Sequence, residues 1–299
     1  MTKFDDILEL IYRKSPLQKK TIQELLARQD TLYFEHAEAI SKVFLRYLES
    51  EGLFAEDWVN AYLKMCSLQA REQIRFGKTG TYQNRTFESC YDAVYSDARQ
   101  MHIILSGLAL SLLLWENHYK ILSFFKECLA VERPNTYCEI GAGHGLFLIE
   151  AFRLHAKLHA CVVDVSPKAI DICRNIVAIA LPLEKNIEFA IEDILHSDFS
   201  QQQFDFIFMG EVIEHVNNPK DLLTILKPML RVNGKAFVTT CCNCPSIDHV
   251  YLFKNVDEIR LLIKSAGLHI VRELVLPNNM NWVIDGKYSE GINYAALLS

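Results

Sequence analysis

The sequence predicts an α/β fold in which an all-helical N-terminal half precedes a doubly wound parallel sheet. Two patterns lead to this prediction. From about residue 119, short apolar runs alternate with amphipathic helical segments, which is typical of a parallel sheet with helices on both faces. Before that point the apolar residues recur only at helical spacing. We therefore expect a helical domain over residues 1–118 and a sheet domain over residues 119–299.

Composition and charge narrow the class of protein. The chain has 299 residues, 50% hydrophobic and 23% charged, with a formal net charge of −6. This predicts a folded chain and argues against nucleic acid as the main partner, because no basic surface is indicated. The longest apolar stretch, residues 103–115, is shorter than the roughly 20 residues of a spanning helix. We expect a cytoplasmic protein with no membrane partner and with reduced cysteines.

Capping residues and apolar spacing predict several helices in the N-terminal half. Ser15 and Pro16 place a capping serine before a proline at the first helical position. The expected helices span about residues 16–29, 33–50 and 56–73. Residues 77–86 form a polar loop that could hinge a lid. A later helix is indicated by large apolar residues at spacings of three and four, which form either a core face or the roof of a pocket: Met101, Leu105, Leu108, Leu112 and Trp115.

Seven strands are expected in the second half. Five are short apolar runs separated by helical segments: residues 136–141, 159–165, 187–193, 204–211 and 235–241. The chain then ends in two further runs, residues 268–277 and 292–299, joined by a loop rather than a helix. We therefore expect an antiparallel pair at the end of the sheet.

A glycine-rich turn, EIGAGHG, follows the first strand. In a doubly wound sheet this turn faces the ligand crevice, and Gly141, Gly143 and Gly145 allow the backbone to approach a ligand closely. A dinucleotide-binding turn would need glycine at position 146, where Leu146 stands. Glu139 inside the strand disfavours a pyrophosphate and favours a cation. Because S-adenosylmethionine carries a sulfonium and an ammonium, charge favours it as the ligand.

Two aspartates follow the next strands. Asp164 ends the second strand, where a carboxylate can accept both hydroxyls of a ribose. Asp193 follows the third, where it can accept from an adenine amino group while the Ile194 N–H meets a ring nitrogen.

With these motifs in order, the sequence resembles the class I S-adenosylmethionine-dependent methyltransferases. EIGAGHG is similar to the family's first motif, VVDVS to its second and FDFIFMGEVIEHVNNP to the motif after its fourth strand. The resemblance covers roughly residues 119–299 and implies the strand order 3-2-1-4-5-7-6, with S-adenosylhomocysteine as product. It implies these cofactor-binding residues: Glu139, Gly141, Gly143, Gly145, Asp164, Val165, Asp193, Ile194, Gly210 and Glu211.

The segment GEVIEHV is expected beside the methyl group. It is similar to that of the ubiquinone-pathway O-methyltransferases, and this resemblance implies His215 as a candidate base, with Glu211 beside it. Alternatively, His215 only caps the following turn. The small-RNA 3'-end methyltransferases are also similar here, which implies that a divalent metal, if bound, is held by Glu211, Glu214, His215 and His249. Without a metal, His249 shapes the substrate pocket.

Cys241, Cys242 and Cys244 suggest a zinc site at first sight. Adjacent cysteines on a strand point to opposite faces, and no second cysteine pair stands nearby. We therefore expect buried or pocket-wall thiols.

Residues 89–102 precede the sheet domain, where a segment in this family commonly covers the active site. Tyr91 and Tyr95 share a helical face that Arg99 continues, which indicates either a substrate cover or plain aromatic packing. The apolar helical half favours a small organic acceptor and could also form a homodimer. We interpret the chain as a methyltransferase acting on oxygen in secondary-metabolite or quinone-like biosynthesis. A carbon or nitrogen methyltransferase, an RNA-end methyltransferase and a non-catalytic cofactor-binding partner subunit remain open.

Overall fold

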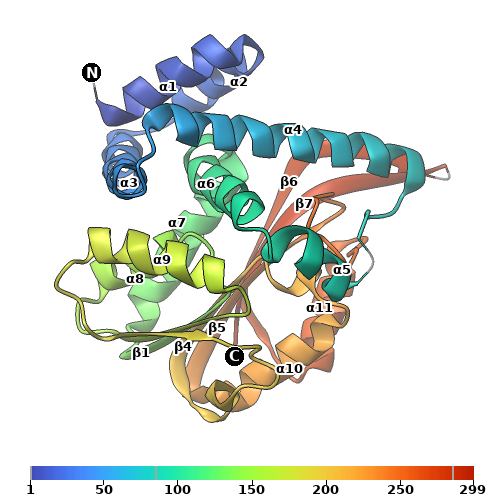
Figure 1. Ribbon diagram of the computed structural model, residues 1–299. Helices are drawn as coiled ribbons and strands as arrows, with labels where there is room; N and C mark the ends of the chain where they lie inside the picture. The colour runs from blue at the N-terminus through green and yellow to red at the C-terminus, as the bar shows by residue number, and fades with distance from the viewer. Residues whose placement is uncertain (1, 85, 285) are drawn as a thin grey trace.

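The computed structural model describes residues 2–84, 86–284 and 286–299, with helices first and then a sheet (Figure 1). Thr2 and Asp5 form a capping box at the start of α1. The Asp30 carboxylate accepts from the Tyr33 N–H at the start of α3. The elements before the sheet are α1 (Lys3–Lys14), α2 (Pro16–Leu26), α3 (Thr31–Ser50), α4 (Ala55–Thr79), α5 (Phe87–Cys90), the π-helical turn η1 (Tyr91–Tyr95), α6 (Ala98–Leu114) and α7 (Glu116–Glu132).

The long helix α4 continues six residues past its predicted end. It ends at Gly80, whose φ of +64° is the left-handed conformation that commonly ends helices. The predicted loop over residues 77–86 is therefore wrong at its start, where three residues are still helical, and its residue 85 lies outside the described residues.

The sheet has the predicted order, β3-β2-β1-β4-β5-β7-β6. The strands β1 to β5 run parallel, and β7 runs antiparallel to both of its neighbours, which confirms the predicted fold class. The strands are β1 (Thr136–Ile140), β2 (His159–Asp164), β3 (Ile187–Ile191), β4 (Phe204–Gly210), β5 (Leu230–Cys242), β6 (Ile270–Ile284) and β7 (Lys287–Leu298).

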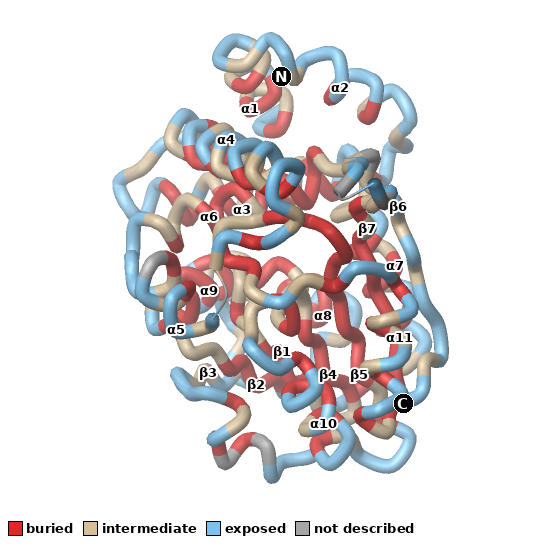
Figure 2. Tube along the Cα trace, turned by 90° about the vertical axis from the view of Figure 1, so that its right-hand side faces the viewer, coloured by how far each residue is buried: buried red, intermediate tan, exposed pale blue. Residues whose placement is uncertain are grey.

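Helices cover both faces of the sheet, and the inner strands β1, β2, β4, β5 and β7 are largely buried, whereas the edge strands β3 and β6 are not (Figure 2). On one face α7, α8 (Leu146–Leu154) and α9 (Pro167–Ala180) pack with the N-terminal helices in one continuous hydrophobic core. On the other face α10 (Pro219–Met229) and α11 (Val256–Ser265) enclose a second core. Because α7 crosses the predicted boundary between residues 118 and 119 and the first core joins both halves, the division into two domains stays a prediction.

The last two strands are longer than predicted. The expected loop between residues 277 and 292 is wrong, because the β6–β7 ladder continues beyond a register shift after Pro277 as far as the pair Ile284 and Lys287. The extension packs on α4, where the Trp282 and Phe76 rings meet edge to face with centroids 5.1 Å apart. The hairpin and α4 are thereby joined (Figure 1).

Helix length and hydropathy give a limited result on membranes. Among the described residues, no single helix is long and apolar enough to cross a bilayer, and the one pair of sufficient combined length, α6 and α7, is bent by 83°.

A buried ion cluster joins the helical half to the sheet. Glu150 on α8 contacts His36 on α3 at 3.0 Å, Lys126 on α7 at 2.7 Å and Arg153 one turn later at 2.5 Å. Burial alone would raise the pKa of Glu150, but His36 and Lys126 lower it to about 2. The carboxylate therefore remains ionised and ties three helices together.

We predict that Glu150→Gln lowers the free energy of unfolding by about 3 kcal/mol near neutral pH, because it leaves partly buried cations without their anion. This value lies at the low end of the range for breaking a buried ion pair, because the side chains of Lys126 and Arg153 are 33% and 34% exposed and keep contact with water. The folded-state pKa is depressed, so the contribution is present above the ordinary pKa of 4.5 and is lost as the pH falls toward about 2. Urea denaturation at about pH 7 and about pH 3 measures it.

The matched control is Asp171→Asn, which removes an exposed carboxylate 3.3 Å from Arg174. It should change stability by less than about 1 kcal/mol. An effect of Glu150→Gln no larger than the control, or one that does not shrink in acid, would contradict the prediction.

Candidate active site

The glycine turn between β1 and α8 is conformationally demanding. Gly141, Gly143 and Gly145 have φ of +88°, +49° and +70°, which disfavour any other residue. A Cβ on Gly141 would also lie 2.7 Å from Val212, and one on Gly145 would lie 2.9 Å from the Cys173 sulfur. The turn therefore lies tightly between the segment after β4 and helix α9, whereas Gly143 faces open space.

Asp164 fastens this turn to the end of β2. Its Oδ2 accepts from the Ala142 N–H at 2.8 Å and its Oδ1 from the Ser166 N–H at 2.7 Å. Burial raises the pKa of Asp164, and the two backbone hydrogen bonds oppose that rise. The carboxyl group also lines the main cavity, where the remaining lone pairs of its oxygens can accept ligand hydroxyls.

Asp193 and Ile194 lie at the edge of the same cavity. Ile194 is buried, whereas Asp193 is exposed and already caps a turn. Its Oδ1 accepts from the Leu195 N–H at 3.0 Å, and its Oδ2 contacts the His196 ring at 2.9 Å. An amino group of a ligand would share these oxygens. Val165 and Gly210 line the cavity as well.

Glu139 does not line the main cavity. It lines a smaller adjoining cavity of about 110 Å³ that shares Gly141 and Glu211 with the main one. The Tyr137 hydroxyl donates to its Oε2 at 2.7 Å, and burial raises the pKa of Glu139 to about 8.

Two histidines that the sequence analysis missed share the small cavity, His118 and His144. Burial lowers their pKa values to about 4 and about 3, so both are neutral near pH 7. The place of His144 between two glycines was a usable signal, while nothing in the sequence marks His118.

The main cavity has a volume of about 1190 Å³. This exceeds the roughly 300–1,000 Å³ typical of a pocket for one ligand, so it has room for two. One end is polar and lies at the carboxyl ends of β1, β2, β4 and β5. The other end reaches the helical half. Its lining combines apolar side chains with polar and charged ones: Leu25, Met65, Met101, Leu105, Leu108 and Trp115 lie there together with Glu24, Arg28, Gln69, Gln73, Glu116 and Lys120.

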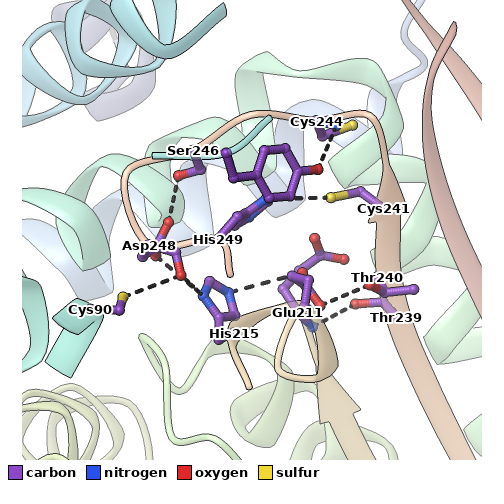
Figure 3. Close-up of polar contacts among 12 residues, drawn as sticks. Cys90, Glu211, His215, Thr239, Thr240, Cys241, Cys244, Ser246, Asp248 and His249 are labelled. Atoms are coloured by element: carbon purple, nitrogen blue, oxygen red, sulfur yellow. Dashed lines mark hydrogen bonds and ion pairs between the residues drawn. The ribbon is translucent and has the colours of Figure 1, made fainter. Parts of the chain in front are cut away.

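His215 stands in the short turn η3 (Ile213–His215) after β4 and lines the polar end. Its Nδ1 lies 2.7 Å from the Asp248 carbonyl oxygen (Figure 3). The same atom lies 2.9 Å from the Tyr95 hydroxyl. Because a carbonyl oxygen only accepts, Nδ1 carries the proton of the neutral ring, and Nε2 has a free lone pair. The structure therefore presents His215 as a proton acceptor through Nε2.

Two glutamates flank this histidine. Glu211 has the unusual φ of +51°, held by hydrogen bonds from its N–H to the hydroxyl and carbonyl oxygens of Thr239 at 3.0 and 3.2 Å. Glu214 accepts from the Thr240 hydroxyl at 2.8 Å, and burial raises the pKa of both glutamates. The two carboxyl groups share a hydrogen bond, and Glu211 adds to the raised pKa of Glu214. Apart from this contact, Oε1 of each glutamate is buried without a hydrogen-bond donor among the described residues. A bound ligand would supply the missing donor or cation.

His249 and Cys241 complete the floor of the cavity (Figure 3). The His249 Nδ1 lies 3.9 Å from the Cys241 sulfur, and its ring meets that of His215 edge to face at 5.0 Å. Burial lowers the pKa of His249 to about 4. Cys242 points the other way, into the second core, as the strand pattern predicts. All four predicted metal ligands lie together, because Glu211 shares a hydrogen bond with Glu214, which lies 3.9 Å from the His215 Nε2, and the His215 and His249 rings meet. Cys241 and Asp248 join them without having been predicted as metal ligands.

The predicted aromatic cover is only partly found. Tyr95 lines the cavity and contacts His215. Tyr91 packs on Phe87 with centroids 5.9 Å apart, outside the cavity lining, and Arg99 is exposed. The expected continuous face is wrong because the helix breaks at Ser96, and Asp97 caps the new helix α6 by accepting from the Arg99 N–H at 2.8 Å.

Comparison with known proteins places the chain in a family of methyltransferases. Residues 114–273 match a family described as "Methyltransferase domain". The chain is 30% identical over 154 residues to a mitochondrial ubiquinone biosynthesis O-methyltransferase of Schizosaccharomyces pombe, and 27% identical over 149 residues to one of Coxiella burnetii. These alignments cover 49% and 50% of this chain, but only 54% and 61% of the relatives' lengths.

Solved structures show the same fold. An O-methyltransferase family protein from Burkholderia thailandensis superposes with a TM-score of 0.55, at 15% identity, over 80% of this chain and 72% of that one.

We predict that Gly141→Ala lowers the free energy of unfolding by about 2–4 kcal/mol, from positive-φ strain plus the contact with Val212. Gly143→Ala is the matched control, since it meets no atom within 4 Å and incurs only the backbone strain of about 1–2 kcal/mol. Urea denaturation of both variants measures the difference, which Val212→Ala in the Gly141→Ala background should remove. If both variants lost the same free energy of unfolding, the close contact between position 141 and Val212 would be refuted.

Proposed function

The chain belongs to the family of methyltransferase domains, as its glycine turn predicts, and from this premise we propose that it transfers a methyl group from S-adenosylmethionine to an oxygen atom of a small organic acceptor. The observation that carries the proposal is the orientation of His215. Its Nδ1 is held by Asp248 and Tyr95, so Nε2 faces the cavity as a base.

The polar end of the cavity fits the cofactor. Asp164 offers carboxylate oxygens to ribose hydroxyls at the end of β2, and the glycine turn leaves space for the backbone of a close ligand. The unpartnered Glu211 oxygen and the buried Glu139 suit a ligand that carries positive charge. When bound, S-adenosylmethionine supplies an electrophilic methyl group on its sulfonium.

The residues of the chain then account for the proton. As the acceptor oxygen forms its bond to the methyl carbon, its hydroxyl proton passes to the His215 Nε2. The resulting imidazolium is stabilised by the Asp248 Oδ2, 3.8 Å from Nδ1. The neighbouring His215 and His249 lower the pKa of Asp248 against the raising effect of burial, which keeps that carboxylate available as a counter-ion.

The apolar end of the cavity supports the acceptor class. The wall formed by α2, α4 and α6 suits an organic molecule with a hydrophobic body, and a ubiquinone precursor, as the names of the relatives suggest, is one such class. Oxygen is the proposed acceptor atom because those relatives are O-methyltransferases and because a hydroxyl, unlike a neutral amine, must lose a proton to a base during transfer.

We predict that calorimetry detects micromolar binding of S-adenosylmethionine and S-adenosylhomocysteine but no binding of NADH. Asp164→Ala should abolish binding, because the ribose hydroxyls lose their acceptor. Asp164→Asn keeps one acceptor oxygen for the backbone hydrogen bonds, so it serves as a second variant that is less prone to unfold. Circular dichroism checks the fold of both variants. Unchanged affinity in the folded variants would show that the ribose site lies elsewhere. Failure of the parent chain to bind either compound would favour a partner-subunit role.

We predict that His215→Ala lowers kcat by roughly 10²-fold or more, with the affinity for S-adenosylmethionine unchanged, because only proton removal is lost. Candidate phenols and catechols, tested with radiolabelled S-adenosylmethionine, provide the assay. The control is His159→Ala, an exposed histidine at the start of β2, which should leave turnover unchanged. A loss confined to KM would reduce His215 to a pocket residue, and label transferred to amines but not to hydroxyls would overturn the choice of oxygen.

A further inference from the structure

The proposed proton transfer leaves one buried cluster at the cavity floor unused. It consists of Glu214 from η3, Cys241 near the end of β5 and His249 from the loop that follows. One side-chain atom from each lies within 4.8 Å of those of the other two, and all three residues are buried. Oxygen, sulfur and nitrogen donors from three separate segments thus meet beside the cavity.

The glutamate of this cluster is held rigidly yet is incompletely satisfied. Its Oε2 accepts from the Thr240 hydroxyl, and its backbone carbonyl accepts from the N–H groups of Val250 and Tyr251 at 2.9 and 2.8 Å. Its Oε1 is fully buried and meets no side-chain or backbone N–H donor in the described part of the chain, although the carboxyl group shares a hydrogen bond with that of Glu211. A bound cation would give this buried oxygen a partner of opposite charge.

A second triad, formed by His215, Asp248 and His249, is equally compact. In that triad the His215 Nδ1 is bound to the Asp248 carbonyl oxygen, and the Asp248 Oδ1 accepts from the Ser246 hydroxyl at 2.5 Å. The triad of Glu214, Cys241 and His249 also makes hydrogen bonds, from the Thr240 hydroxyl to Glu214 and between the Cys241 and Cys244 thiols, but it adds a sulfur ligand 3.9 Å from the His249 Nδ1 and leaves His215 free for proton transfer.

We propose that Glu214, Cys241 and His249 bind one divalent transition metal ion, with zinc as the best match. One carboxylate, one thiolate and one imidazole form a set of three protein ligands that suits zinc and leaves a fourth position open. Cys241 binds as the thiolate and releases its proton to solvent. Glu214 and His249 are two of the four ligands predicted from the sequence. In the proposed site Cys241 takes the place of the other two, Glu211 and His215.

The open position gives the ion a role beside His215, and this role rests on the proposed methyl transfer. His215 and Glu211 line the same end of the cavity, so a hydroxyl bound to the ion would lie near the proposed base. Binding of the ion itself does not depend on that reaction.

The test is a cobalt(II) titration of the full chain after treatment with a chelator. A cysteine thiolate bound to cobalt gives a charge-transfer absorption in the near ultraviolet, so the spectrum reports Cys241 directly and without turnover. We expect this band to saturate at one equivalent and to disappear on addition of zinc. Cys241→Ser should abolish the band, and Glu214→Gln and His249→Asn should each weaken cobalt affinity by roughly 10-fold or more.

The matched control is Cys242→Ser, which changes the neighbouring cysteine on the opposite face of the same strand and should keep the band. Absence of a saturable band in the folded chain would overturn the proposal, as would a band that survives Cys241→Ser or disappears in Cys242→Ser with its fold intact. Calorimetry with S-adenosylmethionine on the same preparation tests the proposed function separately, so failure of one proposal is distinguishable from failure of the other.

Discussion

The arrangement of the site depends on one backbone contact, the Glu214 carbonyl oxygen accepting from the N–H groups of Val250 and Tyr251. The strands β4 and β5 are parallel neighbours, so the segments after them leave the same edge of the sheet. The contact joins those two segments. It thereby sets His215 against Asp248 and Glu214 against His249. Without it the proposed base and the acidic floor would lie on two unconnected loops.

The helical half holds the same loop from the other side. The Tyr82 hydroxyl accepts from the Cys244 N–H at 3.1 Å, the Cys90 thiol donates to the Asp248 carbonyl oxygen at 3.2 Å, and Tyr95 contacts His215 at 2.9 Å. The Asp248 carbonyl oxygen thus accepts hydrogen bonds from both the Cys90 thiol and the His215 imidazole N–H, and the second bond fixes the tautomer of His215. The N-terminal helices therefore form part of the catalytic geometry as well as the apolar wall of the cavity.

The sequence predicted the parts of the fold that local chemistry decides. The alternation of apolar runs with helical segments predicted the parallel sheet, and the resemblance to the class I methyltransferases implied its strand order. The glycines of the turn and the spacing to Asp164 predicted the ligand-facing turn, and the structure places Asp164 against it. It missed Asp248, because its place in the site comes from contacts with Cys90 and His215, which are distant in sequence. It predicted Cys241 as a buried or pocket-wall thiol but not as a neighbour of His249. The hairpin length was wrong for the same reason, since the packing of Trp282 on α4 is a tertiary contact.

Burial explains how an acidic floor is compatible with a stable fold. Burial raises the pKa of Glu139 to about 8 and that of Glu211 above its ordinary value, while it lowers that of His144 to about 3. Near neutral pH Glu139 and His144 are therefore largely uncharged, which avoids the cost of isolated buried charges. A cationic ligand favours ionisation of a carboxyl group beside it, because opposite charges attract strongly in a low-dielectric site. Asp248, whose pKa is lowered, already places an anion at this floor, so the floor favours a cation over an anionic molecule.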